Sequence, residues 1–180
     1  MVESDTPKPR LPDNWGEQEK TVPGDMSQRT GVAFKLHQDI IDLLTSTGVV
    51  IISSSFRAKT DESIHAKYGR REYRRIVDIY GARFILADAD IDLAAITIAN
   101  YYSSSEITEF PYIIDYRDPK NKQQWTSPSY KALHIYFPFG EEEFYHIGEA
   151  QLLTPEWMKT ANRTRRYFER RQLRAKPPQP

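Results

Sequence analysis

Residues 56–83 read F-R-A-K-T-D-E-S-I-H-A-K-Y-G-R-R-E-Y-R-R-I-V-D-I-Y-G-A-R, and the rest of the chain is interpreted from this stretch. Its first part contains three cations and a hydroxyl, at Arg57, Lys59, Ser63 and Lys67. If residues 60–67 are helical, Ser63 and Lys67 lie on one face, four residues apart. Arg57 and Lys59 come just before that helix, where free N–H groups and the helix dipole attract anions. The pattern predicts a cradle for phosphate groups.

A carboxylate follows the cradle. Asp78 comes after two apolar residues and just before Gly81 and an apolar segment at 82–87. The segment is predicted to be a strand, and glycine lets neighbouring groups approach closely. A polyphosphate cradle followed by a carboxylate at the start of a strand is typical of a magnesium-nucleotide site.

The composition indicates one globular domain without a general nucleic-acid surface. The chain has 180 residues, with 25 basic and 25 acidic side chains, so its formal net charge is zero. This balance does not support a basic footprint over the whole surface. There is no cysteine and no apolar run of the roughly 18 residues that a membrane span requires. We expect action in the cytoplasm and no membrane partner.

The chain is expected to have one folded domain between two irregular ends. Residues 1–26 combine four prolines with many charges, which favours a mobile arm or a linker. Residues 27–174 are expected to form the domain, and residues 175–180 a proline-rich tail. Ser27 or Thr30 is predicted to cap a first helix that ends before Gly48.

Apolar periodicity predicts the other elements. Asp88 or Asp90 is expected to cap a helix that runs to about residue 102, and Thr154 one that runs over 155–171. Strands are predicted at 49–53, 82–87, 111–116, 130–137 and 144–153. The fold class is therefore α/β, of the α+β kind, with a mixed sheet of about five strands flanked by helices.

These residues resemble a known family. The blocks Arg57-x-Lys59-x-x-x-Ser63-x-x-x-Lys67 and Asp78-x-x-Gly81-x-Arg83 are similar to the synthetase domain of RelA/SpoT proteins, the alarmone synthetases. The segment Y-K-A-L-H at 130–134 resembles the family's Tyr-Arg-Ser-Leu-His, and E-A-Q at 149–151 resembles its Glu-Ile/Val-Gln strand. The blocks occur in the family's order over about residues 50–154. The resemblance implies a nucleotidyltransferase-like sheet.

The resemblance also implies a donor site for ATP. In the family, the residues matching Arg57 and Arg83 hold the adenine between their guanidinium planes. Guanidinium groups stack well on aromatic faces. The residues that match Lys59, Ser63 and Lys67 hold the phosphates.

The two carboxylates are the candidate catalytic and metal-binding residues. An aspartate and a glutamate from two strands can hold one Mg²⁺, which keeps water and phosphate oxygens as its other ligands. Asp78 and Glu149 are the pair here. In the family, the glutamate matching Glu149 also helps to activate the 3′-hydroxyl of the acceptor.

The acceptor site is expected on two later strands. Alternation along a strand places Tyr130 with His134 on one face, and Glu149 with Gln151 on one face. In the family, this tyrosine stacks on the acceptor base and the histidine lies by the acceptor's phosphates. Lys131 and Gln151 complete the predicted acceptor-binding set.

All departures from the family pattern fall on the acceptor side. Ser129 replaces a usual glycine, Lys131 an arginine and Ala132 a serine, and the loop before Tyr130 is longer and contains Trp125. ATP is therefore the expected donor. The acceptor stays open between GDP or GTP, adenine nucleotides, and the tRNA 3′ end, the last two being substrates of toxin relatives.

The implied activity is transfer of the β,γ-pyrophosphate of ATP to a 3′-hydroxyl, which gives (p)ppGpp when the acceptor is GDP or GTP. A non-catalytic nucleotide sensor is the alternative, although such a protein would lack Asp78, Glu149 or the Arg57 block. A toxin would imply an antitoxin or immunity partner. An arginine-rich stretch at 163–174 would suit contact with nucleic-acid phosphates.

Overall fold

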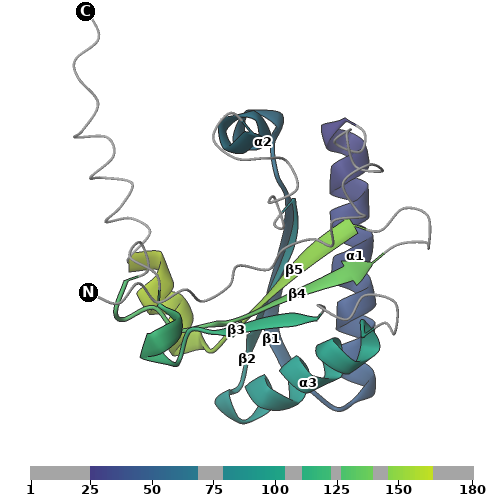
Figure 1. Cartoon of the computed structure of the whole chain (residues 1–180). Coiled ribbons are helices and arrows are strands. Elements are labelled where there is room, and N and C mark those ends of the chain that lie inside the picture. Colours follow the sequence, from purple (N-terminus) through teal and green to yellow (C-terminus); the bar gives the residue numbers. More distant parts are fainter. Residues whose placement is uncertain (1–24, 69–78, 104–110, 123–126, 140–145, 164–180) are drawn as a thin grey trace, which may run out of the picture.

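A computed structural model describes residues 25–68, 79–103, 111–122, 127–139 and 146–163, and every structural statement below concerns these ranges. The described strands form one mixed sheet in the order β1-β2-β5-β4-β3 (Figure 1). Strands β2 and β5 are parallel, and the other neighbouring pairs are antiparallel. The strands are β1 Ile51–Ala58, β2 Tyr80–Leu86, β3 Tyr112–Asp115, β4 Leu133–Phe139 and β5 His146–Leu153. This confirms the predicted α+β fold with a five-stranded mixed sheet.

Two helices cover one face of this sheet. Helix α1 (Met26–Ser46) and helix α3 (Ile91–Tyr101) pack beside each other against the strands (Figure 1). Their apolar sides meet the even-numbered residues of β2 and β5 and the odd-numbered residues of β4 in one core, because alternate strand residues point to the same face. Side chains buried there include Leu36, Ile40, Ile98, Phe84, Ile135, Phe137 and Leu152.

Helix α1 begins one residue after an aspartate, so neither predicted cap is right. Asp25 accepts a hydrogen bond from the Gln28 N–H at 2.9 Å, and the Gln28 side chain accepts one from the Asp25 N–H at 3.1 Å. This reciprocal arrangement satisfies two N–H groups at once. Ser27 and Thr30 lie inside the helix. The predicted end is confirmed, since Gly48 adopts the left-handed conformation with φ of 82°.

Strand β1 is longer than predicted. The sequence predicted a strand at 49–53, but β1 runs through three serines as far as Ala58. It lies at the edge of the described sheet, paired there with β2 alone, and most of its residues are exposed. Polar residues are tolerated at such an edge. As a result, Arg57 belongs to the strand and not to the turn before the next helix.

Two further boundaries differ from the predictions. Asp90 comes just before α3, but its side chain makes no cap and instead accepts from the Val50 N–H at 3.4 Å. Strand β4 begins at Leu133, so Tyr130 lies in the segment that leads into the strand. Thr154 does cap the next helix, accepting from the Trp157 N–H at 3.2 Å, and this helix is described over 155–163.

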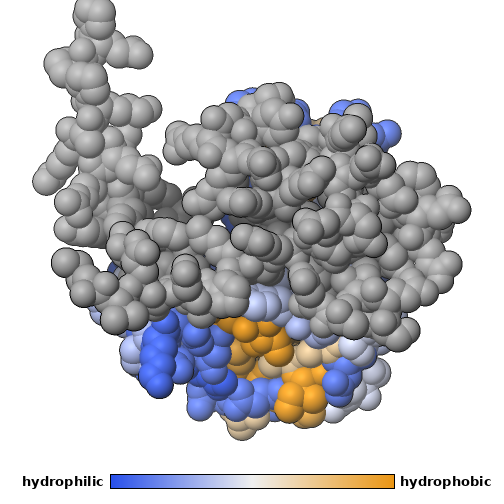
Figure 2. All heavy atoms as spheres, in the orientation of Figure 1, coloured by the Kyte–Doolittle hydropathy of each residue, from blue (hydrophilic) through white to orange (hydrophobic). Residues whose placement is uncertain are grey.

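The remaining surface includes an apolar part on α3. Figure 2 shows apolar residues between hydrophilic ones along the lower edge, where Figure 1 places this helix. Leu93 and Ile96 are 47% and 58% exposed. No helix in the described ranges is both long enough and apolar enough to cross a membrane.

Candidate active site

The face of the sheet opposite α1 and α3 carries polar side chains from four adjacent strands. Gly81 on β2, Glu149 on β5 and Tyr136 on β4 are directly paired across the sheet. Two residues along, Arg83 is paired with Gln151 and Gln151 with His134. Directly paired residues point to the same face, so the register alone brings these side chains together. The adjacent end of this face is covered by the helix at 155–163, whose Met158 and Trp157 pack on Ile85 and Leu153.

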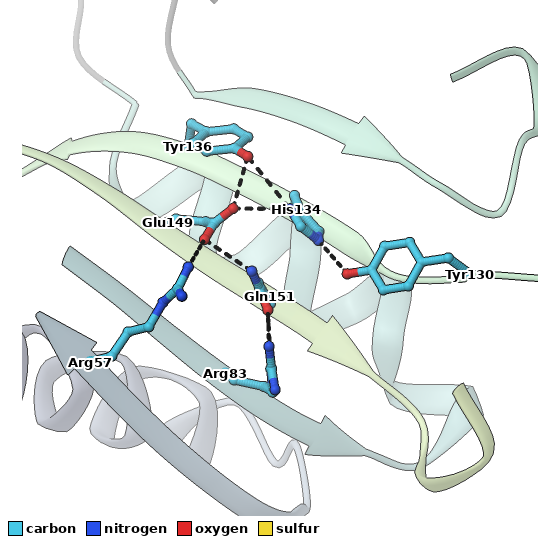
Figure 3. Close-up of polar contacts among 7 residues, drawn as sticks. All are labelled: Arg57, Arg83, Tyr130, His134, Tyr136, Glu149 and Gln151. Carbon is cyan, nitrogen blue, oxygen red and sulfur yellow. Dashed lines mark hydrogen bonds and ion pairs between the residues drawn. The ribbon is translucent and has the colours of Figure 1, made fainter. Parts of the chain in front are cut away.

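Glu149 lies at the centre of this group (Figure 3). Its Oε1 accepts hydrogen bonds from the Tyr136 hydroxyl at 2.8 Å and from His134 Nδ1 at 3.0 Å. Its Oε2 accepts from Gln151 Nε2 at 2.9 Å and lies 3.8 Å from the Arg57 guanidinium. Only 5% of the Glu149 side chain is exposed, so these donors replace the water that it has lost.

The contacts keep this buried carboxylate ionised. Burial alone would raise the pKa of Glu149, but hydrogen bonds from His134 and Tyr136 and the nearby charge of Arg57 lower that pKa to about 2. A base with so low a pKa takes up protons poorly near neutral pH. In the free protein, therefore, Glu149 is better suited to attracting a cation or orienting a hydroxyl than to removing a proton.

Gln151 connects Glu149 to Arg83. Arg83 donates to Gln151 Oε1 from Nε at 3.0 Å and from a terminal nitrogen at 2.7 Å. Since the Gln151 oxygen accepts both bonds, its NH₂ group must face Glu149. This confirms that Glu149 and Gln151 share one strand face. In the free protein, however, the Gln151 side chain is engaged by Arg83 rather than open to an acceptor.

His134 connects Glu149 to Tyr130. Its Nε2 lies 2.8 Å from the Tyr130 hydroxyl, while Nδ1 faces Glu149. A carboxylate can only accept, so Nδ1 carries a proton; in the neutral ring, Nε2 then accepts from Tyr130. The ring of Tyr130 packs edge-on to Tyr116 at 5.5 Å. The predicted pairing of Tyr130 with His134 is therefore present, although Tyr130 precedes the strand.

Arg57 reaches this group across the β2 backbone at Gly81. A β-carbon built at position 81 would lie 3.4 Å from Arg57 Nε and 3.8 Å from Glu149 Oε2. Glycine thus leaves the path between β1 and β5 clear of a side chain. The Arg57 side chain is 59% exposed and remains accessible from solvent.

Of the predicted phosphate cradle, Ser63 and Lys67 lie on helix α2 (Asp61–Tyr68), which follows the end of β1 (Figure 1). Thr60 accepts from the Ser63 N–H at 3.3 Å, so one of the N–H groups expected to hold an anion is already used. Two acidic residues, Asp61 and Glu62, also occupy the first turn. An anion here would therefore depend on cationic side chains. Lys59 is half-buried before the helix, and Lys67 belongs to α2, with its side chain outside the described set.

An ion pair attaches α2 to α1. Arg29 is almost fully buried, and its guanidinium lies 2.5 Å from the Asp61 carboxylate. Among the α2 side chains that the structure describes, at 61–64, Ile64 is buried. The sequence analysis did not identify Arg29, because nothing in a single arginine on a helix indicates a partner 32 residues away.

Besides the cradle residues Lys59, Ser63 and Lys67, two more predicted site residues are not placed in this group. Asp78 lies outside the described residues, so the predicted pair of carboxylates cannot be observed together. Lys131 is exposed. Within the described ranges, no three histidine or acidic side chains cluster in a way that could hold a metal.

Tyr136 is a site residue that sequence reasoning missed. It continues the alternation from His134, which was the available signal, but it lies outside the motif blocks on which the sequence prediction rested. Its hydroxyl group contacts the carboxylate directly.

Comparison with known proteins supports the same fold. No family model matches the sequence, and no curated protein does. Solved structures do match. A GTP pyrophosphokinase family protein from Streptococcus pneumoniae aligns with a TM-score of 0.59 at 15% identity, covering 93% of this chain and 82% of that one. The chain has the fold of the small alarmone synthetases.

Two structures from Bacillus subtilis carry that name. Small alarmone synthetase 2 aligns with a TM-score of 0.58 at 19% identity, covering 93% of this chain and 85% of that one. Small alarmone synthetase 1, solved with its product pppGpp, aligns with a TM-score of 0.54 at 18% identity, covering 82% of each chain. At these identities the likeness establishes the synthetase fold, and the chemistry has to be argued from the side chains of this chain.

Proposed function

We propose that this protein is an ATP-dependent pyrophosphokinase that transfers the β,γ-pyrophosphate of ATP to the 3′-hydroxyl of GDP or GTP. The observation that carries the proposal is the position of Glu149. An ionised, buried carboxylate lies between a cationic side, formed by Arg57 and Arg83, and an aromatic side, formed by Tyr130 and His134. Such an arrangement fits two nucleotides that meet at one point.

The cationic side would bind ATP. Arg57 and Arg83 come from neighbouring strands and point to the same face, where their guanidinium planes could stack on adenine. Lys59, Ser63 and Lys67 would neutralise the phosphates. Because α2 has two acidic residues in its first turn, we expect the lysines to contribute more than the helix N-terminus.

The aromatic side would bind the acceptor. Tyr130 offers a ring for base stacking, and His134 anchors the Tyr130 hydroxyl and so fixes the direction of that ring. Stacking does not choose between guanine and adenine, because each base has a π-face. Guanine is proposed because the synthetase structure with the same fold was solved with pppGpp.

The reaction would be an in-line displacement. The acceptor's 3′-oxygen attacks the β-phosphorus of ATP, the bond from that phosphorus to the α,β-bridging oxygen breaks, and AMP leaves with that oxygen. The hydroxyl proton passes to solvent or to a bound phosphate oxygen. Glu149 would accept a hydrogen bond from the 3′-hydroxyl and hold it in line, so the chain supplies positioning and charge.

Magnesium is the proposed cofactor, and one atom of Glu149, Oε2, is suited to bind it. Oε1 already accepts two short hydrogen bonds, whereas Oε2 accepts one and faces Arg57 at 3.8 Å. Oxygen is the ligand that Mg²⁺ prefers. Glu149 Oε2 would hold it together with Asp78, and the ion would neutralise charge on the transferred phosphates.

An acceptor panel tests the proposal. The protein is incubated with ATP labelled at the γ-phosphate, Mg²⁺, and one of GDP, GTP, ADP, ATP or tRNA, and the labelled product is separated. We expect transfer to GDP or GTP. Label on an adenine nucleotide or on tRNA would identify that molecule as the acceptor in place of GDP or GTP. The absence of transfer to all five acceptors would reject the proposed activity.

Glu149→Gln assigns the activity to this site. It removes the charge and keeps the shape, so transfer should be abolished while ATP binding, measured by calorimetry, persists. Glu156→Gln is the matched control, because it removes an exposed carboxylate in the helix that follows β5. A Glu149→Gln variant with the wild-type rate would contradict the role of Glu149.

A further inference from the structure

We propose that Tyr136 is a positioning residue, which commits Oε1 of Glu149 to the protein and so leaves Oε2 to face the substrates. The inference rests on the proposed function of this site and adds a residue to it. Tyr136 matches none of the motif blocks that indicated the site.

The sheet register directs the Tyr136 hydroxyl to its target. Tyr136 is paired directly with Glu149 on β5 and with Tyr112 on β3, so its side chain lies on the site face between two strands. It is only 8% exposed, and its hydroxyl donates to Glu149 Oε1 at 2.8 Å. A buried ring between neighbouring strands has little freedom to move this hydroxyl away.

The two carboxylate oxygens are treated differently. A carboxylate oxygen accepts about two strong hydrogen bonds, and on Oε1 both come from groups buried in the sheet, Tyr136 and His134. On Oε2, one bond comes from Gln151, and the other neighbour is the exposed Arg57 side chain. Oε2 is therefore the oxygen that an arriving group can reach by displacing the exposed Arg57 side chain.

Without the Tyr136 hydroxyl, one donor is left on Oε1, and the carboxylate can rotate about its last side-chain bond. Groups that orient a catalytic or metal-binding residue typically change activity by about 10- to 100-fold when removed. We expect a loss of that size in kcat for Tyr136→Phe. Tyr136 lies on β4, across β5 from the strands that carry Arg57 and Arg83, so the KM for ATP should stay within about twofold of the wild-type value.

Tyr102→Phe is the matched control. Tyr102 is also partly buried and stacks on Phe137 at 4.1 Å, on the opposite face of the sheet. It should keep the wild-type kcat. Urea unfolding of both variants separates a lost orientation from a lost fold, because a structural effect alone would lower the folded fraction without changing the rate per folded molecule.

A measurement on the free protein makes the result independent of turnover. With glutamate labelled by ¹³C at the carboxyl carbon, the Glu149 resonance is assigned by its disappearance in Glu149→Gln. Tyr136→Phe should shift this resonance, and Tyr102→Phe should not.

The outcomes separate the two ideas. An active wild type with an unchanged kcat in Tyr136→Phe overturns the positioning role and leaves the activity intact. A wild type that is inactive on every acceptor overturns the proposed function. In that case, a shifted Glu149 resonance in Tyr136→Phe still supports the positioning role, and an unshifted one rejects it.

Discussion

His37, which lies outside the site, should make folding sensitive to acid. His37 on α1 is buried between Phe56 and Phe84, with ring centroids at 5.3 Å and 5.5 Å, and neither ring nitrogen has a hydrogen-bond partner among the described residues. Burial lowers the pKa of His37 from its ordinary value of 6.5. The native protein therefore holds the ring neutral, while the unfolded chain binds a proton below pH 6.5.

Stability should fall as the pH drops below about 6.5, by at most about 1.4 kcal/mol per pH unit from this group. His37→Leu keeps an apolar side chain of similar size and cannot be protonated. Urea unfolding at pH 7.5 and at pH 5.5 should show a smaller loss for the variant than for the wild type. Equal losses would mean that other groups cause the acid sensitivity.

Gly81 allows a second prediction for one residue. A single β-carbon there would make only an ordinary contact with Arg57 Nε, at 3.4 Å, but a branched side chain would block the path to Glu149. Gly81→Val should therefore raise the apparent KM for ATP severalfold, and Gly81→Ala should change this KM little. Initial rates over a range of ATP concentrations check this. If the valine and alanine variants behave alike, Arg57 does not need this path.

At the scale of elements, two described contacts position α2. Among the described side chains of the helix, Ile64 is buried, and Asp61 pairs with the buried Arg29 of α1. The Asp61 side chain is 57% exposed, so solvent screens the pair and its contribution to stability is modest, about 1 kcal/mol or less. Its larger effect should be on where the helix lies.

Asp61→Asn should weaken the attachment of α2 to α1. The apparent KM for ATP should then rise, because the cradle residues would no longer be held in place. Glu62→Gln is the matched control, since it removes the same charge from the same turn without an ion pair to α1. If the charge near the phosphates is what matters, both variants should bind ATP more tightly. A weaker affinity in Asp61→Asn alone supports the tether.

The elements also show what could be predicted from sequence. Periodicity predicted the central strands β2, β4 and β5 well, because one face of each packs on a continuous apolar core. It missed the second half of β1, where serines at an exposed edge carry no apolar signal. Alternation predicted that Glu149 and Gln151 lie on one face of their strand. The contact of Glu149 with Tyr136 depends on the register between β4 and β5, which the sequence of either strand does not specify. Arg29 is buried by tertiary packing, which local pattern does not predict.

At the scale of the whole molecule, β5 joins two halves. Strands β1 and β2 carry Arg57 and Arg83, while β4 and its leading segment carry His134 and Tyr130. Hydrogen bonds to Glu149 and Gln151 connect both sides. Changes on one side should therefore affect mainly one substrate.

Tyr130→Ala should raise the apparent KM for the acceptor about 5- to 150-fold, since stacking on a base is worth about 1–3 kcal/mol. The KM for ATP should change little. Tyr130→Phe keeps the ring and loses the hydroxyl bond to His134, so it separates stacking from orientation. Steady-state kinetics with both substrates varied measures this. Equal changes in the two constants would place the acceptor elsewhere.

The position of β5 has a consequence for synthesis on the ribosome. The other four strands are made first, yet β5 lies in the middle of the finished sheet, between β2 and β4. Neighbouring strands are about 4.8 Å apart. In the finished sheet, the pairs β1–β2 and β3–β4 are therefore separated by nearly 10 Å, the space that β5 fills. A nascent chain that ends before residue 146 already contains every cation and aromatic ring of the proposed site, but it lacks the carboxylate between them. The protein should therefore acquire its fold and its chemistry in the same step, when β5 leaves the ribosome.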